Sequence, residues 1–268
     1  MKVTRVCVLL CVVDMVQAVT LLHDVVYIVC WSSSKIRRYS ITTRERLTYI
    51  DVKGLRRPWD IAACELTSQL YVCDWSEKCI WRVSSDGEDI RRWWTSSDTL
   101  IPWTLSVTSS RLLVTSLDTH ELMQLSAGGD VLQHVHLPSY MYPLRHSVES
   151  PTGTFIVSHI NTQLNWQSHV SEVNIEGDVL RQFSRSSLGD PDPEHIAVDS
   201  QGNIFVADRV NCRILLLDAQ LALRRVIIDK RQLNDERPSR LCYIEHLGQL
   251  IVGSIDSDSV AVFDVLYR

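Results

Sequence analysis

Five prolines in this chain are each followed at once by residues that could bind a ligand or take part in a reaction. The prolines are Pro58, Pro102, Pro143, Pro193 and Pro238. They are followed by Trp59 and Asp60, Trp103 and Thr104, Leu144 and Arg145, Glu194 and His195, and Ser239 and Arg240, with His146 one place further along. Tryptophan and arginine are side chains that often anchor a protein partner. Asp60, Glu194, His146 and His195 could instead form a metal or acid–base cluster, or be structural residues at strand ends.

These residues can act together only if the elements that carry them converge, and the repeats in the sequence predict that they do. The clearest repeat is HIAVDSQGNIFVAD from His195, in which two apolar runs flank a short polar turn. Weaker copies begin at Asp60, Thr104, Arg145 and Arg240, so the pattern recurs roughly every 45 residues. Each first strand is expected to begin two residues after its proline.

The second half of each unit also repeats, as two further strands joined by a glycine turn. Asp86-Gly87, Gly128-Gly129 and Glu176-Gly177 stand between such runs, and hairpin turns of this kind need residues at positive φ. Four strands in a repeat of this length are typical of a β-propeller blade. Because the first strands of a propeller line its central channel, the residues after the prolines should meet at one channel mouth.

The two ends of the chain complement each other. The last unit, from Pro238, has only three strands, while residues 2–13 form an apolar run that belongs to no unit. Pairing that run with the last unit would leave no open sheet edge. We therefore predict an all-β fold, a single domain over residues 1–268. It has six four-stranded blades that start near residues 14, 58, 102, 143, 193 and 238.

The apolar N-terminus has a second interpretation, as a secretory signal cleaved after Ala18. Cleavage there would remove the strand that closes the ring. The sequence contains no Asn-x-Ser/Thr glycosylation site. We therefore expect a cytoplasmic protein, with secretion as the alternative if residues 1–18 are a signal peptide.

The turns between second and third strands should share the rim that carries the prolines, which we call the proline rim. They place Trp75, Arg209 and Asn211 near the mouth. The fourth unit has an unusually long stretch there, from His159 to His169, which predicts a long surface turn. Insertions of this kind on a repeat scaffold often lie on a binding face.

Asp74 and Asp208 end their second strands at the same place in the repeat, and Ser116, Ser158 and Ser254 are assigned to that place in other units. An aspartate at such a position can accept backbone N–H groups of the turn. The recurrence favours a structural role over a catalytic one.

The eight cysteines show no Cys-x-x-Cys pair and no zinc-ligand spacing. Most lie inside apolar runs, where a cysteine acts as a small hydrophobic residue. Cys73 and Cys79 flank a tight turn and could face each other across a hairpin. A disulfide between them would require an oxidising compartment.

The charge pattern bears on the class of partner. The net charge is −5, and the arginines are scattered in pairs rather than gathered in a stripe. This pattern disfavours a nucleic-acid partner without excluding a local basic patch. No stretch is long enough to predict a membrane-spanning helix, and we expect a monomeric domain.

The segment PEHIAVDSQGNIFVADRVNCRILLLD, residues 193–218, resembles an NHL repeat. The segment LYVCDWSEKCIWRVSSDG resembles the YWTD propellers of lipoprotein receptors. Both resemblances imply a six-bladed propeller of the TolB-like superfamily. NHL propellers of the TRIM type bind proteins or RNA across one face, and the amidating lyase, a relative of this fold, holds metals in its channel with several histidines. Nothing in this sequence matches the zinc modules that precede TRIM-type propellers.

The resulting hypothesis is a non-catalytic scaffold that binds a protein or peptide through the proline rim and the channel mouth. The residues assigned to binding are Trp59, Asp60, Trp75, Trp103, Arg145, His146, His195, Arg209, Asn211 and Arg240. The first alternative is a hydrolase or lyase with a metal at the channel mouth, and the second is RNA binding by the same rim. Outside the enzymatic alternative, no metal or cofactor is expected.

Overall fold

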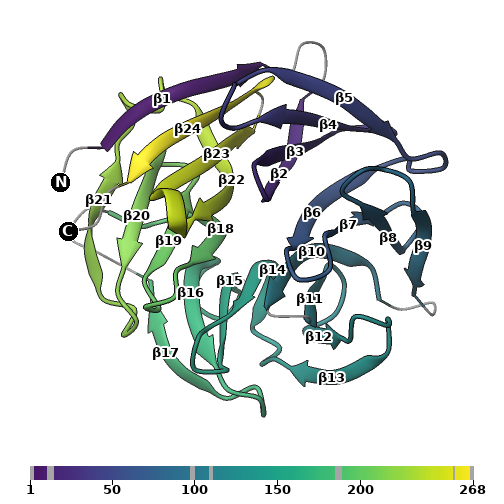
Figure 1. The fold of residues 1–268 in the computed structure, drawn as a ribbon. Coiled ribbons are helices and arrows are strands. Elements are labelled where there is room, and N and C mark those ends of the chain that lie inside the picture. The colour runs from purple at the N-terminus through teal and green to yellow at the C-terminus, as the bar shows by residue number, and fades with distance from the viewer. Residues whose placement is uncertain are drawn as a thin grey trace.

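The computed structural model describes residues 3–10, 15–96, 100–108, 111–184, 189–255 and 257–265. These residues form six four-stranded antiparallel sheets arranged as a ring (Figure 1). The predicted all-β, six-bladed propeller is therefore confirmed. A single short 3-10 helix, η1 (Glu245–Leu247), interrupts the strands of the described part.

The first blade consists of β2 (Val16–Leu22), β3 (Val25–Cys30), β4 (Lys35–Ser40) and β5 (Arg46–Asp51), and the second of β6 (Pro58–Cys64), β7 (Gln69–Asp74), β8 (Cys79–Ser84) and β9 (Ile90–Thr95). The third contains β10 (Pro102–Thr108), β11 (Arg111–Ser116), β12 (Glu121–Leu125) and β13 (Val131–His136), and the fourth β14 (Met141–Glu149), β15 (Phe155–Asn161), β16 (Gln167–Val173) and β17 (Val179–Phe183). The fifth contains β18 (Pro193–Val198), β19 (Ile204–Asp208), β20 (Arg213–Leu217) and β21 (Leu223–Ile228). The sixth joins β22 (Arg237–Ile244), β23 (Gln249–Ile255) and β24 (Ser259–Val265) to β1 (Val3–Leu10).

The N-terminal strand closes the ring, as predicted from the unmatched ends. β1 pairs antiparallel with β24, from Val3 opposite Val265 to Leu10 opposite Ser259. In Figure 1 the purple N-terminal strand lies beside the yellow C-terminal one. This pairing gives β24 a partner on its outer side, where its backbone N–H and C=O groups would otherwise be exposed.

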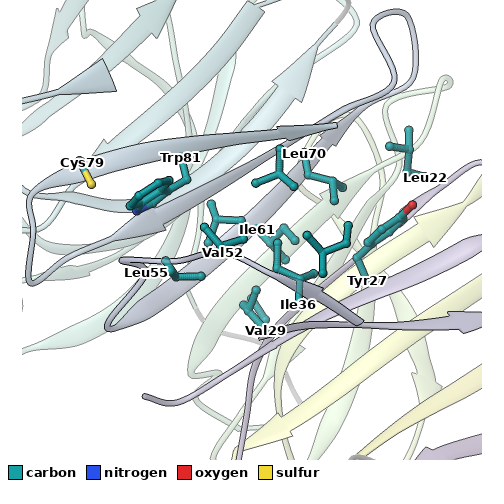
Figure 2. Packing of buried hydrophobic residues seen from close by; sticks show 14 residues of the cluster. Leu22, Tyr27, Val29, Ile36, Val52, Leu55, Ile61, Leu70, Cys79 and Trp81 are labelled. Carbon is teal, nitrogen blue, oxygen red and sulfur yellow. The ribbon is translucent and has the colours of Figure 1, made fainter. Parts of the chain in front are cut away.

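The hydrophobic core lies between neighbouring blades, so most strands bury both faces. Figure 2 shows the cluster between the first and second blades, in which Leu22 and Tyr27 lie toward one end and Trp81 lies at the other end, near Leu55. Each fully buried apolar side chain of this size stabilises the fold by about 1.5 to 3 kcal/mol. Burial on two faces explains why a strand such as IFVAD (β19) is a continuous apolar run rather than an alternating one.

Each first strand contains a bulge at one fixed place. The proline pairs with the last residue of the second strand in the second, third and fifth blades and with the last but one in the sixth. In all four the next residue has no partner, and regular pairing then resumes. The prolines therefore belong to the strands, rather than standing two residues before them as the sequence analysis expected. A bulge of this type re-aims the side chains around it.

The fourth blade departs from that register by one residue. In the second blade, the residue that pairs just before the bulge is Pro58, opposite Asp74. In the fourth blade, the residue at that place is Leu144, opposite His159, and not Pro143. His146 is therefore the equivalent of Asp60, whereas Arg145 occupies the bulge. For the same reason the assignment of Ser158 to the position of Asp74 is wrong, since His159 lies there.

The expected long turn between β15 and β16 is absent, because the residues extend the two strands instead. His159 pairs with His169 and Asn161 pairs with Gln167, so the turn itself is residues 162–166. By contrast, the glycine turns are as predicted. Gly87 has φ +85 and Gly177 has φ +89, in the region that favours glycine.

Asp74 and Asp208 have the structural role predicted for them. Asp74 accepts the backbone N–H of Ser76 at 3.2 Å within its turn and that of Arg56 at 2.7 Å from the segment leading into β6. Asp208 accepts the backbone N–H of Asp192 at 2.9 Å. Each carboxylate thus ties its own blade to the incoming chain.

The proposed pairing of Cys73 with Cys79 is wrong. Cys79 lies opposite Asp74, whereas Cys73 lies opposite Ile80. The two side chains consequently point to opposite faces of the blade and belong to different core clusters. Both are free thiols, and burial raises the pKa of Cys79 to about 12.

Among the described residues, no helix has both the length and the apolar character needed to cross a membrane.

Candidate functional site

The centre of the propeller holds one side chain from each blade. The residue that follows the bulge occupies the same register position in every first strand. These six residues, which we call the channel ring, are Ala18, Asp60, Thr104, His146, His195 and Arg240. All six are at most 7% exposed. Because the first strands are the innermost ones (Figure 1), polar side chains from distant parts of the chain meet here.

Hydrogen bonds connect the channel ring from blade to blade. Asp60 Oδ2 accepts the N–H of Leu105 at 2.8 Å, and Thr104 Oγ1 donates to the carbonyl of Arg145 at 3.0 Å. His146 Nδ1 accepts the N–H of Ile196, and His195 Nδ1 that of Leu241, both at 3.4 Å. Arg240 donates to the carbonyl of Trp59 at 3.3 Å. In each case a side chain of one blade satisfies the backbone of another.

The channel ring contains one cation, one anion and two neutral imidazoles. Burial raises the pKa of Asp60 to about 6, and Arg240 and the N–H of Leu105 limit that rise. Arg240 Nε lies 3.7 Å from Asp60 Oδ1, an ion pair without a direct hydrogen bond between these atoms. Burial lowers the pKa of His146 to about 3 and that of His195 well below its usual range, with Arg240 adding to both effects. The histidine rings stack at 3.6 Å between centroids.

Asp60, His146 and His195 have ligand atoms within 4.8 Å of one another, which is close enough to consider a metal ion. The hydrogen bonding does not fit one. A metal-bound histidine usually donates its other ring N–H to an oxygen acceptor. Here Nδ1 of both rings accepts a backbone N–H instead, so a neutral ring carries its proton on Nε2 and has no lone pair left for a metal. The positive charge of Arg240 opposes a cation further.

The mouth of the channel is a separate cavity of about 440 Å³ on the proline-rim side of the channel ring. It is lined by residues that precede the ring position, together with Trp31 from the β3–β4 turn. Trp31, Trp59 and Trp103 form its apolar wall, and Glu194 and Arg209 lie on its polar side. Arg240 also lines it, at the channel ring. We call this cavity the tryptophan mouth.

The indole rings form a chain of contacts along the wall. Trp59 stacks on Trp103 at 3.8 Å between centroids, and Trp31 meets Trp59 edge-on at 5.9 Å. Trp75 does not line the cavity but stacks on Trp31 at 6.4 Å, under the guanidinium of Arg57. All four tryptophans are partly exposed. The rings therefore support one another while keeping an accessible apolar surface.

The opposite side of the tryptophan mouth is an ion-pair network. Arg145 Nη1 lies 2.7 Å from Asp192 and 3.2 Å from Glu194, and Arg209 Nε lies 3.2 Å from Asp192. Although burial alone would raise the pKa of Asp192, the two arginines and Ser168 lower it. Arg145 is only 12% exposed in its side chain. It therefore holds the fourth and fifth blades together rather than presenting a free guanidinium to a ligand.

The ten residues assigned to binding from the sequence thus fall into three groups. Trp59, Trp103, Arg209 and Arg240 line the tryptophan mouth, while Trp75 supports it from behind. Asp60, His146 and His195 lie in the channel ring and do not line the mouth. Arg145 is ion-paired, and Asn211 donates to Asp208 at the start of its turn and to the carbonyl of Asp190 in the segment that leads into β18.

Sequence reasoning missed two residues of this site. Trp31 follows Cys30 at the end of β3 just as Trp75 follows Asp74 at the end of β7, so the repeat register carried the signal for it. Asp192 bridges Arg145 and Arg209. It lies between two prolines in the segment that leads into β18, and nothing in that context indicated the ion pairs.

The comparisons with known proteins identify the fold. No family model and no curated protein sequence matches the chain. Solved structures resemble it, among them a gluconolactonase from Xanthomonas campestris, at 12% identity and a TM-score of 0.73, over 96% of this chain and 88% of that one. Virginiamycin B lyase from Staphylococcus aureus has 12% identity and a TM-score of 0.68, over 94% of this chain and 80% of that one. A chain of a nidogen/laminin complex has 16% identity and a TM-score of 0.64, over 82% of each chain.

At such low identities these matches show a shared propeller fold and not a shared activity. The group includes enzymes as well as a structure of a protein–protein complex. Membership of the NHL family stays a prediction. On this evidence the chain is a six-bladed β-propeller whose function has to be argued from its own residues.

Proposed function

We propose that the chain is a non-catalytic scaffold that binds a protein or peptide by taking an apolar side chain into the tryptophan mouth. The observation that carries this proposal is the cavity of about 440 Å³ walled by Trp31, Trp59 and Trp103. Its volume suits one or two side chains of a loop or a peptide. Tryptophans in a concave, largely desolvated setting are the residues that dominate the energy of protein interfaces.

The polar side of the mouth supports the same proposal. Arg145, Arg209, Asp192 and Glu194 carry two positive and two negative charges, and they are already paired with one another. The network therefore holds Glu194 and Arg209, which line the mouth, as preorganised hydrogen-bonding groups at the edge of an apolar pocket, an arrangement suited to a peptide backbone. Its balanced charge gives no electrostatic attraction to an RNA backbone.

A binding role is favoured over catalysis by the position of the ionisable residues. Among the described residues, Asp60, His146 and His195 near the centre have strongly shifted pKa values, and they lie in the channel ring and do not line the tryptophan mouth. A general acid or base must come within hydrogen-bond reach of the substrate. Similar folds include a gluconolactonase and a lyase as well as nidogen in a complex with laminin, and among these roles the last is the nearer to our proposal.

A selection of peptides tests the proposal. With the purified chain as bait, a phage library of random dodecapeptides should yield peptides that share an apolar anchor residue. We expect Trp103→Ala to weaken the binding of such a peptide by at least about 30-fold, the loss of about 2 kcal/mol that defines a hot spot. Fluorescence anisotropy of the labelled peptide gives the affinities.

Trp166→Ala is the matched control, because Trp166 is 65% exposed on the same rim but lies outside the mouth. Its removal should change the affinity less than about twofold. Gln17 also lines the mouth, and Gln17→Trp, which narrows the mouth without removing a packed ring, should weaken binding as well. The proposal is wrong if Trp166→Ala matters more than Trp103→Ala. Salt-sensitive binding of an oligouridine that survives both Trp103→Ala and Gln17→Trp would favour RNA instead.

A further inference from the structure

A second and larger cavity lies on the other side of the channel ring. Its volume is about 570 Å³, and first strands of all six blades line it. Ile61, Leu105, Ile196 and Leu241, which line it, directly follow ring positions, whereas residues that precede them line the tryptophan mouth. Because the first strands all run in the same direction through the ring, the two cavities open on opposite faces. We call the second cavity the apolar funnel.

Most residues that line the apolar funnel are hydrophobic, and the polar ones are Thr20, Glu65, Ser106, His146 and His195. Besides the hydrophobic residues named above, Val19, Leu21, Val107, Val148 and Val198 contribute to its walls. Its inner end is formed by His146 and His195, and Glu65 stands at the exposed outer edge. A concave cavity of this volume with few polar groups is typical of a site for a small molecule.

Two buried polar atoms of residues that line the funnel have no hydrogen-bond partner among the described residues. They are Nε2 of His146 and Oγ of Ser106. His146 is 2% exposed. Since buried polar atoms are nearly always paired, and leaving one unpaired costs about 1 to 3 kcal/mol, such atoms need a physical explanation.

The protonation of His146 defines what its unpaired atom can do. Nδ1 accepts the backbone N–H of Ile196, and burial together with Arg240 lowers the pKa of the ring to about 3. The ring is therefore neutral at physiological pH, with its proton on Nε2. Nε2 is thus a hydrogen-bond donor, and the Ser106 hydroxyl is able to donate as well.

We infer that the apolar funnel binds a neutral, largely apolar small molecule that carries one hydrogen-bond acceptor, such as a ketone or ether oxygen, at its inner end. The apolar body lies against the valine and leucine walls, and the oxygen accepts from His146 Nε2 and Ser106 Oγ. A carboxylate is disfavoured, because no described cation lines the funnel while Glu65 lies at its edge. This site is independent of the one proposed at the tryptophan mouth.

Fluorescence titration with prodan, a neutral naphthalene that bears a ketone, tests the inference. Binding should shift its emission to the blue, and unlabelled propionylnaphthalene should compete for the site more strongly than propylnaphthalene, which lacks the acceptor. We expect Ser106→Ala to weaken prodan binding about threefold to tenfold through the loss of one hydrogen bond. The Ser106 hydroxyl makes no hydrogen bond with the described residues, so this change should leave folding intact.

A second variant tests the location. Ala197 lines the funnel and is half-buried, so Ala197→Phe should fill it and weaken binding by at least about tenfold. Ala127→Phe, at an exposed turn position on the third blade, is the matched control and should have no effect. The inference is overturned if Ala197→Phe and Ser106→Ala leave prodan binding unchanged. It is also overturned if Trp103→Ala removes that binding, which would place the probe in the tryptophan mouth.

Discussion

Lowering the pH from 7.5 to 5.0 is expected to reduce the free energy of unfolding of this protein by about 4 to 5 kcal/mol. The cause is a set of buried histidines held neutral by the fold. Burial lowers the pKa of His146 to about 3, that of His159 to about 4 and that of His195 well below its usual range. In the unfolded chain all three titrate near the ordinary value of about 6.5.

The sign follows from where each proton binds. Between pH 6.5 and the lowered values, the unfolded state takes up protons that the native state does not, so stability falls as the pH falls. At pH 5.0 each of the three histidines costs about 2 kcal/mol. Asp60 acts in the opposite sense, because burial raises its pKa to about 6, and its protonation at pH 5.0 offsets about 1 kcal/mol of that loss.

Urea unfolding at the two pH values, followed by tryptophan fluorescence, measures this difference. His195→Gln should reduce the pH-dependent loss by about 2 kcal/mol whatever it does to stability at pH 7.5. His246→Gln is the control, since His246 is exposed, and should leave the loss unchanged. Equal stability of the wild type at pH 7.5 and 5.0 would contradict the buried, neutral state assigned to these rings.

Replacing Arg240 by alanine is expected to destabilise the protein by about 3 to 5 kcal/mol, because it leaves the buried carboxylate of Asp60 without its cation. Arg240 also donates to the carbonyls of Ser239 and Trp59, which would lose their donor. Arg224→Ala is the matched control. It breaks an exposed ion pair with Asp218, and such pairs contribute at most about 1 kcal/mol.

A double variant separates the loss of charge pairing from the loss of packing. Combining Arg240→Ala with Asp60→Asn removes the unpaired charge, so the double variant should be more stable than Arg240→Ala alone at pH 7.5. The gap between the two should narrow at pH 5.0, because Asp60 then becomes protonated in the single variant. If the gap is the same at both pH values, the Asp60–Arg240 pair is not the interaction that the arginine supplies.

The sequence predicted the ring of blades and its closure because these depend on a repeated local pattern. The repeats could be aligned with one another on the segment HIAVDSQGNIFVAD. The missing fourth strand of the last unit and the unmatched N-terminal run together predicted the pairing of β1 with β24. The same register also led correctly to a structural role for Asp74 and Asp208, although the backbone N–H that Asp208 accepts comes from the incoming segment and not from its turn.

The errors arose where tertiary structure overrides local pattern. Relative to the bulge, Pro143 stands one place earlier than the other prolines. Aligning the fourth unit with the others on this proline therefore assigned Arg145 and Ser158 to positions that are one residue off. The long stretch near His159 became longer strands because every added residue found a cross-strand partner. Pairing of Arg145 with Asp192 joins two blades, and no periodicity within one blade could predict it.

The separation of two cavities by a single polar layer also lay beyond sequence reasoning. The sequence predicted that Asp60, His146, His195 and Arg240 would converge, but it placed them at the channel mouth. Burial in a hydrogen-bonded layer explains why Asp60, His146 and His195 do not line the mouth, whereas Arg240 of the same layer does.

The most direct test of the account is a crystal structure of the protein with a peptide selected as described above. We predict that an apolar side chain of the peptide lies in the tryptophan mouth against Trp59 and Trp103, with the peptide backbone near Glu194 and Arg209. The channel ring should keep the same hydrogen bonds as in the free protein. A peptide bound elsewhere on the propeller, with the mouth unfilled, would contradict the central claim.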